Sequence, residues 1–347
     1  MVFYRFFLLA TLLSGSFITK VQAEETDQFT LPPVALQDIG SAASQQLYAV
    51  LEKVVAQTNE DIQRLLPLAK RNPIAAHHLA VRLGDAYIPD RVYANTGPGF
   101  PRWLRWRLLP QKLKTKPLEY KEIWPWKTVY WLVFSQCPFS LIGLASTVNM
   151  YGYDFGADKL GHFFMQGHTY YTIYNFLIKH GKTAQQAHDI MIMYGQALEH
   201  TYLGTLINGV YSNGDLSGNY AGWKFYTNIA HPITIGKKTW PAILVRNGHT
   251  WEFSKARSLD NLKQNLLKPF ISDNLNEAFN PCKYSFMRGQ IRRQIKKRCP
   301  RWIKEKGLTP VLVNAKLKET QLWHGENYGH WLPSSKAVTL NSCFGGK

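Results

Sequence analysis

The sequence lacks the short motifs of the commonest nucleotide-binding and hydrolytic enzymes. It contains no Rossmann glycine pattern, no P-loop, no G-x-S-x-G and no HExxH. Each of these motifs supplies groups that its chemistry requires, so the corresponding enzyme classes are not indicated. The sequence also has no CxxC pair, which leaves no sign of a zinc ribbon or a thioredoxin-like redox site.

Acidic residues are scarce: 23 Asp and Glu stand against 41 Lys and Arg, a formal net charge of +18. A chain this basic is expected to seek anionic lipid, lipopolysaccharide or wall polymer, with peripheral contact to a membrane. Nucleic acid is not the partner we expect. The alternative interpretation is that the charge only keeps the protein soluble.

The first 23 residues have the order of a secretory signal peptide. Arg5 precedes the apolar run FFLLATLLSGSFI, and Val21-Gln22-Ala23 provides small residues at a cleavage site. We expect cleavage after Ala23 and a periplasmic or otherwise exported protein. No cysteine lies near the cut, so lipid anchoring there is not expected. Loss of Arg5 and Lys20 takes the charge from +18 to +16.

The mature chain contains four cysteines, Cys137, Cys282, Cys299 and Cys343. In an oxidising compartment they predict disulfides, and four cysteines allow three connectivities. A Cys282–Cys299 pair would close a short loop, which is worth on the order of 3 kcal/mol.

The hydrophobic spacing predicts a mainly α-helical fold: a helical domain around a central three-helix motif, with irregular basic loops and a small β-hairpin. Residues 36–66 have helical spacing, Asn72-Pro73 marks a helix start, and Asn247-Gly248 fits a hairpin turn. The expected regions are the signal peptide 1–23, an N-terminal helical segment 24–95, a basic Trp/Pro-rich loop 96–127, the central helical region 128–230 and a basic C-terminal region 231–347.

Residues 128–153 contain no charged side chain. The segment is long enough to span a bilayer. However, it holds a central proline, and the preceding basic loop would lie on the side that the positive-inside rule disfavours. We expect a buried helix or a re-entrant hairpin, and a spanning helix is the alternative.

Three helices, expected at 157–180, 184–207 and 215–229, bring polar groups onto apolar faces. Asp158 and His162 are four residues apart on one face, as are Asp215 and Asn219. Glu199 lies on an apolar stripe, where a carboxylate needs a partner or stays protonated. The nearest partners in the sequence are Lys159, His162 and His200. Gly218 and Gly222 would let the third helix approach a neighbour closely.

These groups allow two kinds of chemistry. Asp158, His162, Glu199 and Asp215 resemble an oxygen and nitrogen ligand set for a divalent metal. Alternatively, His162 or Glu199 acts as a general base, and Lys159 or Asn219 binds a phosphate or carbonyl oxygen. Structural roles compete with both interpretations. Asp158 suits a first helical turn, and Ser212 to Asp215 fits a capping box.

The same residues resemble the VanZ-like group of bacterial envelope proteins. The shared pattern is Asp158-Lys159-x-x-His162-Phe163, then Glu199, then Asp215, Asn219 and Gly222. The stretches GADKLGHFF, GVYSNGDLSGNYAGWKFY and NEAFNPCKY are also similar to a set of uncharacterised exported proteobacterial proteins. The resemblance covers about residues 154–226 and implies that the three helices belong together, with their polar positions facing one centre.

A basic amphipathic helix is expected near 286–306. Its cations include the candidate ligand-binding residues Arg292, Arg293, Lys296 and Lys297. These features lead to two functional hypotheses. The first is an exported cell-envelope protein that binds an anionic lipid or wall component through basic surfaces. The second is a metal-assisted or general-base hydrolase of a phosphate- or acyl-bearing envelope molecule.

Overall fold

The computed structural model describes residues 24–96, 116–122, 124, 127–130, 143–201, 203–205, 209–284, 288–329 and 337–345. The predicted signal peptide, most of the predicted loop 96–127 and Cys137 lie outside the described residues.

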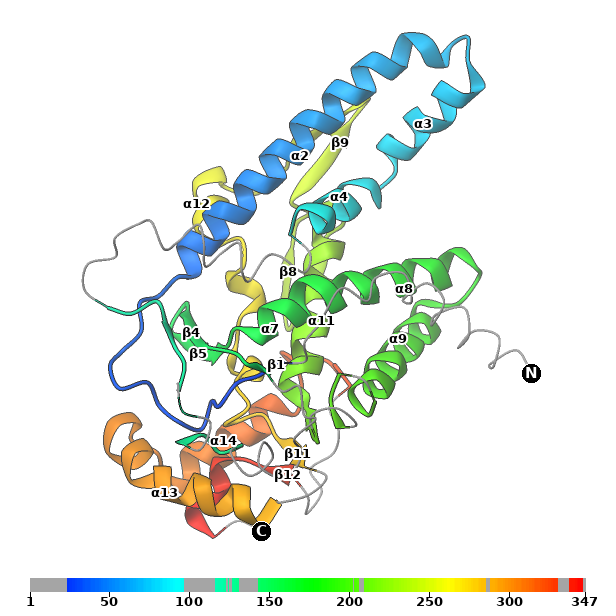
Figure 1. Ribbon diagram of the computed structural model, residues 1–347. Helices are drawn as coiled ribbons and strands as arrows, with labels where there is room; N and C mark the ends of the chain where they lie inside the picture. The colour runs from blue at the N-terminus through cyan, green and yellow to red at the C-terminus, as the bar shows by residue number, and fades with distance from the viewer. Residues whose placement is uncertain are drawn as a thin grey trace.

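More than half of the described residues are helical, which confirms the mainly α-helical fold (Figure 1). The longest helix, α2 (Gly40–Ala69), extends from the body, and α3 (Pro73–Leu83) returns beside it. The other helical elements are α4 (Tyr87–Thr96), α7 (Asp158–Gly161), the π-helical turn η3 (His162–Gln166), α8 (Gly167–Lys179), α9 (Ala184–Glu199), α11 (Asn213–Ala230), α12 (Leu259–Asn265), α13 (Arg288–Lys306), α14 (Pro310–Thr320) and the 3-10 turns η4 (Lys268–Phe270), η5 (Asp273–Leu275) and η6 (Leu340–Phe344).

The strands are short and pair in twos and threes. The one parallel pair among the described strands joins β1 (Glu24–Glu25) to β3 (Gly143–Leu144). The antiparallel groups are β2 (Glu119–Tyr120) with β4 (Thr147–Met150) and β5 (Tyr153–Gly156); β6 (Val210–Ser212) with β11 (Cys282–Tyr284) and β12 (Ala337–Val338); β7 (Ile233–Ile235) with β8 (Lys238–Trp240); and β9 (Leu244–Asn247) with β10 (Thr250–Phe253). The β9–β10 pair confirms the predicted hairpin, and Gly248 supplies its left-handed turn residue at φ +59°.

The N-cap residues predicted from the sequence are present at the starts of α3 and α11. The Asn72 side chain accepts hydrogen bonds from the backbone nitrogens of Ile74 and Ala75 at the start of α3. Ser212 Oγ accepts one from the backbone nitrogen of Asp215 at the start of α11. Both contacts satisfy amides that have no partner inside a helix, so these two helix starts are fixed by nearby residues.

The prediction of a buried helix is wrong for residues 143–153. Residues 143–150 contain β3 and β4, and Tyr151 and Gly152 form a left-handed turn into β5. A strand buried on both faces lacks charge just as a buried helix does, so the uncharged composition could not separate the two. Across the described ranges, no helix is long and apolar enough to cross a membrane.

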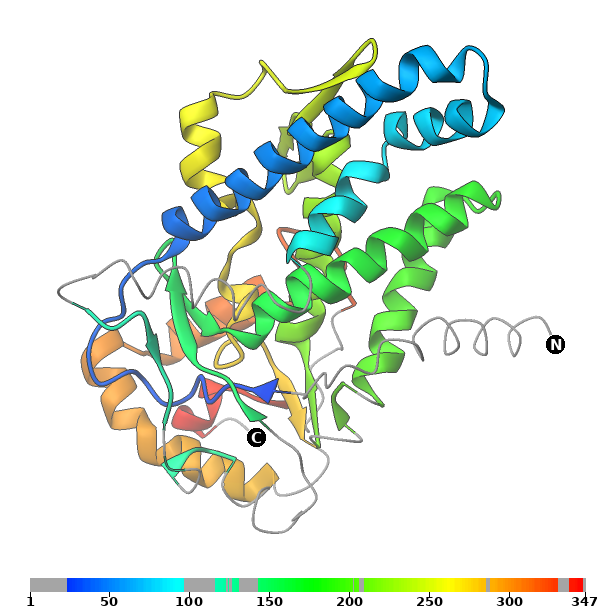
Figure 2. The same cartoon turned by 45° about the horizontal axis from the view of Figure 1, so that its top comes forward.

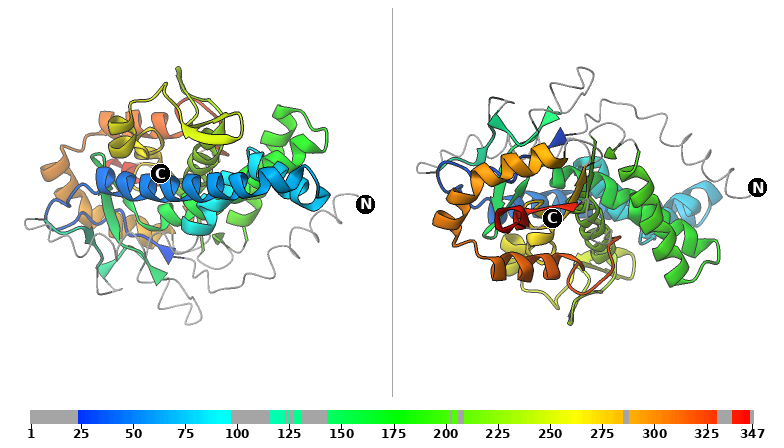
Figure 3. Two further views of the ribbon diagram at one scale, coloured as in Figure 1. Left: turned by 90° about the horizontal axis from the view of Figure 1, so that it is seen from above. Right: turned by 90° about the horizontal axis from the view of Figure 1, so that it is seen from below.

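Two apolar cores hold the elements together. The larger core includes α11, whose residues are buried along nearly its whole length and which packs against α8, η3 and α4, and it extends to the buried side of α2. The smaller core lies beneath α13 and contains Ile291, Ile295 and Trp302. Figure 2 shows α11 running through the body, and Figure 3 shows α13 and α14 on the face opposite α2.

The predicted close approach of the third helix is present. A Cβ added at Gly222 would lie 2.0 Å from the backbone oxygen of Phe163, and one at Gly218 would lie 3.2 Å from His162 Cβ. At Gly222 only hydrogen fits at this separation of α11 and η3, whereas at Gly218 a methyl group would be tight but not excluded. This packing brings the polar residues of the two elements together.

One disulfide joins Cys299 on α13 to Cys343 in η6, with a Cα–Cα distance of 5.5 Å. The prediction of a disulfide is therefore confirmed. The short-loop Cys282–Cys299 pairing is not the one formed, because Cys282 is a buried free thiol. The disulfide ties the outermost basic helix to the C-terminal segment.

Candidate functional site

Lys159 lies at the centre of a buried group of acids. Its side chain is fully buried, and its Nζ atom lies 2.6 Å from Asp158 Oδ2 and 2.5 Å from Asp215 Oδ1. It also contacts Glu277 Oε1. The ammonium donates hydrogen bonds to Asp158 and Glu277, whereas its contact with Asp215 is an ion pair without hydrogen-bond geometry.

His162 continues this arrangement on η3. Its Nε2 lies 3.3 Å from Asp215 Oδ2, and its Nδ1 lies 3.0 Å from Asn219 Oδ1. The predicted spacing of Asp215 and Asn219 on one face of α11 therefore places both beside the same imidazole. With both ring nitrogens directed at these side chains, the ring is held in one orientation.

Glu199 is the last residue of α9, which ends earlier than the predicted 184–207 helix. Its Oε1 accepts a hydrogen bond of 2.9 Å from the backbone nitrogen of Ser212, a donor that differs from the expected Lys159, His162 and His200. Burial, followed by the charge of Asp215, raises the pKa of Glu199 well above its ordinary value. The protonated state considered from the sequence is therefore favoured.

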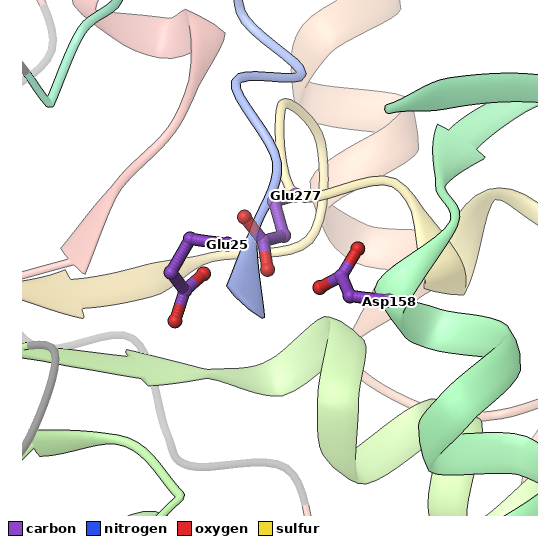
Figure 4. A group of neighbouring side chains, drawn as sticks. All are labelled: Glu25, Asp158 and Glu277. Atoms are coloured by element: carbon purple, nitrogen blue, oxygen red, sulfur yellow. The ribbon is translucent and has the colours of Figure 1, made fainter. Parts of the chain in front are cut away.

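Two members of the group were missed by the sequence interpretation: Glu25 in β1 and Glu277 after η5. Figure 4 shows Glu25 and Glu277 beside Asp158, on segments far apart in the chain. Ser212 Oγ donates to Glu277 Oε1 at 2.7 Å, so Ser212 links Glu277 to Glu199. Glu277 lies within the quoted NEAFNPCKY stretch, which was the only signal for it.

Neighbouring hydroxyl groups donate further hydrogen bonds to this group. Thr26 Oγ1 donates to Asp158 Oδ1 at 2.7 Å, and Tyr130 Oη donates to Glu277 Oε2 at 3.4 Å. We call the six ionisable residues at its core the buried charge centre: Glu25, Asp158, Lys159, Glu199, Asp215 and Glu277. All six are at most 9% exposed.

The buried charge centre has more acids than bases. Burial, followed by the charges of neighbouring acids, raises the pKa of Glu25 well above its ordinary value. Burial also raises the pKa of Glu277, against the opposing charge of Lys159. For Lys159, burial lowers the pKa, but the surrounding carboxylates outweigh it and raise the pKa well above normal. The geometry therefore favours a charged lysine together with protons shared among the acids.

The expected metal ligands do not form one converging set. Within the described ranges, the one group of acids, histidines or cysteines whose ligand atoms converge to within 4.8 Å is Glu25, Asp158 and Glu277. It shares only Asp158 with the predicted set of Asp158, His162, Glu199 and Asp215. The Lys159 ammonium contacts two of these three acids, Asp158 and Glu277, and so already neutralises part of the group.

The candidate ligand-binding cations of α13 differ from one another. Arg292 donates to the backbone oxygen of Ala337 at 3.1 Å, and burial lowers its pKa. By contrast, Arg293, Lys296 and Lys297 are exposed. The sequence interpretation treated all four alike, whereas the structure separates one cation with a backbone contact from three that face solvent.

No protein-family model, no curated protein and no solved structure matches this chain.

Proposed function

We propose that the protein is an exported cell-envelope protein that binds an anionic envelope component through α13. The observation that supports this proposal is the set of exposed cations at positions 293, 296, 297 and 304, within about three turns of α13. We call Arg293, Lys296, Lys297 and Lys304 the basic face of α13. At 3.6 residues per turn they share one side of the helix.

The opposite side of α13 is anchored, so the basic face is presented on a rigid support. Ile291, Ile295 and Trp302 are buried in the smaller core, and Cys299 forms the disulfide. Within the described ranges, no ion pair joins the basic face to an acid of the protein. Each lysine or arginine close to an anionic membrane contributes about 1 kcal/mol, so four such cations predict roughly thousand-fold stronger binding at low salt.

Vesicle co-sedimentation of the mature chain tests this proposal. We expect binding to phosphatidylcholine vesicles that contain phosphatidylglycerol, weakening as salt screens the charges, and little binding to phosphatidylcholine alone. Replacement of all four cations of the basic face by glutamine should abolish most of the difference between binding to anionic vesicles and binding to neutral vesicles. Equal binding to neutral and anionic vesicles at low salt would refute lipid binding, and a polymer-retention assay would then test wall polymer.

A matched control removes the same charge elsewhere. Lys70, Arg71, Lys179 and Lys182 are exposed and lie outside α13. Their replacement by glutamine also lowers the net charge by four, and it should leave vesicle binding nearly unchanged. If both four-site variants lose binding equally, overall charge is responsible and the basic face is not the binding surface.

A second candidate is the hydrolase, with His162 or Glu199 as general base. The observation in its favour is the π-helical turn that carries His162, since π-helical turns occur frequently at functional sites. Against it, both ring nitrogens of His162 already face side chains, and Glu199 is buried. Metal analysis of protein purified without chelator, with Glu199→Gln and His162→Ala as variants, tests it. Bound metal that both variants lose would support the hydrolase.

We also propose that the chain is related to the VanZ-like group. Its support is that the residues carrying the pattern, Lys159, His162, Asp215 and Asn219, contact one another in the fold. We propose that this arrangement organises the helices and that the basic face of α13 acts separately from it.

A further inference from the structure

Arg257, in the segment between β10 and α12, is a partly buried cation without an acidic partner. Its Nη2 donates a hydrogen bond of 2.6 Å to Asn228 Oδ1, an uncharged acceptor. Among the described residues, its buried Nε atom has no hydrogen-bond partner, and no carboxylate pairs with its guanidinium. By contrast, Arg301 lies 2.7 Å from Glu305. Within the described part of the chain, the charge of Arg257 is therefore not compensated.

Partial burial makes this charge unfavourable. The loss of contact with water lowers the pKa of Arg257 to about 10, and no described acid acts against that effect. An arginine side chain otherwise keeps its proton at much higher pH. Because a buried charge is favourable only when it is paired, an anion beside this guanidinium would stabilise the charged arginine.

The Asn228 amide holds the guanidinium in one place. Asn228 is fully buried near the end of α11, and its Nδ2 donates to the carbonyl oxygens of His231 at 3.1 Å and Pro241 at 3.0 Å. These two bonds fix the amide, and its Oδ1 is the atom that accepts from Arg257. The position of the cation is therefore set by a well-packed part of the fold.

A second cation lies against the same indole ring as Arg257. Lys238 Nζ is 3.9 Å from the centroid of the Trp240 ring, and Arg257 Cζ is 5.6 Å from the centroid. Lys238 and Trp240 are two residues apart on β8, so their side chains share one face of the strand. Lys238 is exposed and pairs with no described acid. We call Lys238, Trp240 and Arg257 the cationic indole site.

We propose that the cationic indole site binds a dianionic phosphate group, as carried by inorganic phosphate and by phosphate monoesters. Such a group has close to two negative charges at pH 7.5, which match the two unpaired cations, whereas a carboxylate or a phosphodiester has one. Its oxygens accept hydrogen bonds from several directions, and a guanidinium can donate to two of them at once.

The cationic indole site is separate from the basic face of α13. Arg257 directly precedes α12, which packs against α2, and α13 lies on the face opposite α2 (Figure 3). The proposal therefore does not depend on vesicle binding by α13. Soluble phosphate monoesters and phosphatidic acid in a membrane both present this phosphate group, and the experiments below distinguish these two sources.

Isothermal titration calorimetry of the mature chain with inorganic phosphate tests the site. At pH 7.5 we expect one saturable site with a Kd on the order of 1 mM. Arg257→Gln and Lys238→Gln should each weaken binding about tenfold or more, because each removes a charged donor. Binding should also weaken at pH 5.5, where phosphate carries mainly one charge, and dimethyl phosphate, a monoanion, should bind more weakly than phosphate at pH 7.5.

Arg71→Gln is the matched control, because Arg71 is an exposed arginine between α2 and α3. It removes the same charge and should leave the Kd unchanged. Lys238 is exposed, so its replacement tests the site even where Arg257→Gln does not fold. The absence of saturable binding by the unaltered chain, or an equal loss in Arg71→Gln and Lys238→Gln, would overturn the proposal, since Arg257 would then only join Asn228 to Trp240.

Vesicles that contain phosphatidic acid distinguish the two sources of phosphate. A chain with glutamine at the four positions of the basic face removes the contribution of α13 to co-sedimentation. If Lys238→Gln lowers the remaining vesicle binding, the phosphate belongs to a lipid. If Lys238→Gln weakens only the binding of free phosphate, the ligand is a soluble phosphate monoester. A Lys238→Gln variant that changes neither measurement would overturn the proposal, whatever the basic face of α13 binds.

Discussion

Replacement of Lys159 by methionine removes the ammonium of the buried charge centre and keeps a side chain of similar length. Three carboxyl groups contact that ammonium, and each is at most 4% exposed in its side chain. Removing one partner of a buried ion pair costs about 3–5 kcal/mol, because the remaining charges stay buried without compensation. Since whole domains are stable by roughly 5–15 kcal/mol, we expect a loss of about 3–5 kcal/mol near pH 7.5.

The loss should depend on pH. A carboxyl whose pKa is raised by folding stabilises the fold fully below its unfolded pKa, and this contribution disappears as pH rises through the folded value. The pKa values of Glu25 and Glu277 are already raised, and removal of Lys159 would raise them further. The Lys159→Met variant should therefore approach the wild type toward pH 5 and fall further behind it toward pH 9.

Urea unfolding of the mature chain, followed by tryptophan fluorescence at pH 5, 7.5 and 9, measures both effects. Lys179→Met is the matched control, because Lys179 is exposed in the last turn of α8. Its change should stay within about 0.5 kcal/mol. A loss below about 1 kcal/mol for Lys159→Met at pH 7.5, or a loss that is the same at every pH, would refute a charged lysine at the centre.

Three further predictions concern other parts of the fold. Because burial raises the pKa of Glu199, the contribution of its protonated carboxyl to the stability of the fold is lost as pH rises. Glu199→Gln should therefore flatten the decline of the urea midpoint between pH 6 and 9. An unchanged slope would contradict this. Gly222→Ala places a methyl group 2.0 Å from a backbone oxygen and should lower the free energy of unfolding by more than about 3 kcal/mol. Gly161→Ala is the control, because the space around Gly161 is open, and it should be neutral or stabilising in thermal melts. Cys343→Ser opens a disulfide that spans 44 residues and should cost about 4 kcal/mol in urea unfolding; Cys299→Ser should cost the same, and reducing agent should have no further effect on either variant.

The parts of the fold that depend on neighbouring residues could be predicted from the sequence. Asn72 and Ser212 act on amides two or three residues away, and the periodicity around α8 and α11 reports which faces are buried. The arrangement of Asp215 and Asn219 around His162 was also accessible, because a four-residue spacing fixes one helical face. The capping box expected from Ser212 to Asp215 forms only in part: Ser212 Oγ accepts from the backbone nitrogen of Asp215, whereas the backbone nitrogen of Ser212 donates to Glu199.

The parts that depend on distant contacts could not be predicted. Glu277 reaches Lys159 across 118 residues, and Thr26 reaches Asp158 across 132. No periodicity links such positions, and Glu25 stands only two residues after the expected leader. The buried helix predicted for the uncharged run before β5 was wrong for a different reason. The absence of charge indicates that a segment is buried, but it does not distinguish a helix from a strand.

The π-helical turn η3 has a consequence for tolerance to insertion and deletion. Such a turn holds about one residue more than an α-helical turn, and one residue corresponds to about 100° of rotation. Lys159 precedes the turn and Tyr170 follows it, each directed at a different neighbour. Deletion of Gln166, the last residue of the turn, would leave every hydrophobic side chain of η3 available, yet it would swing one half of this long helical stretch out of phase with its partners.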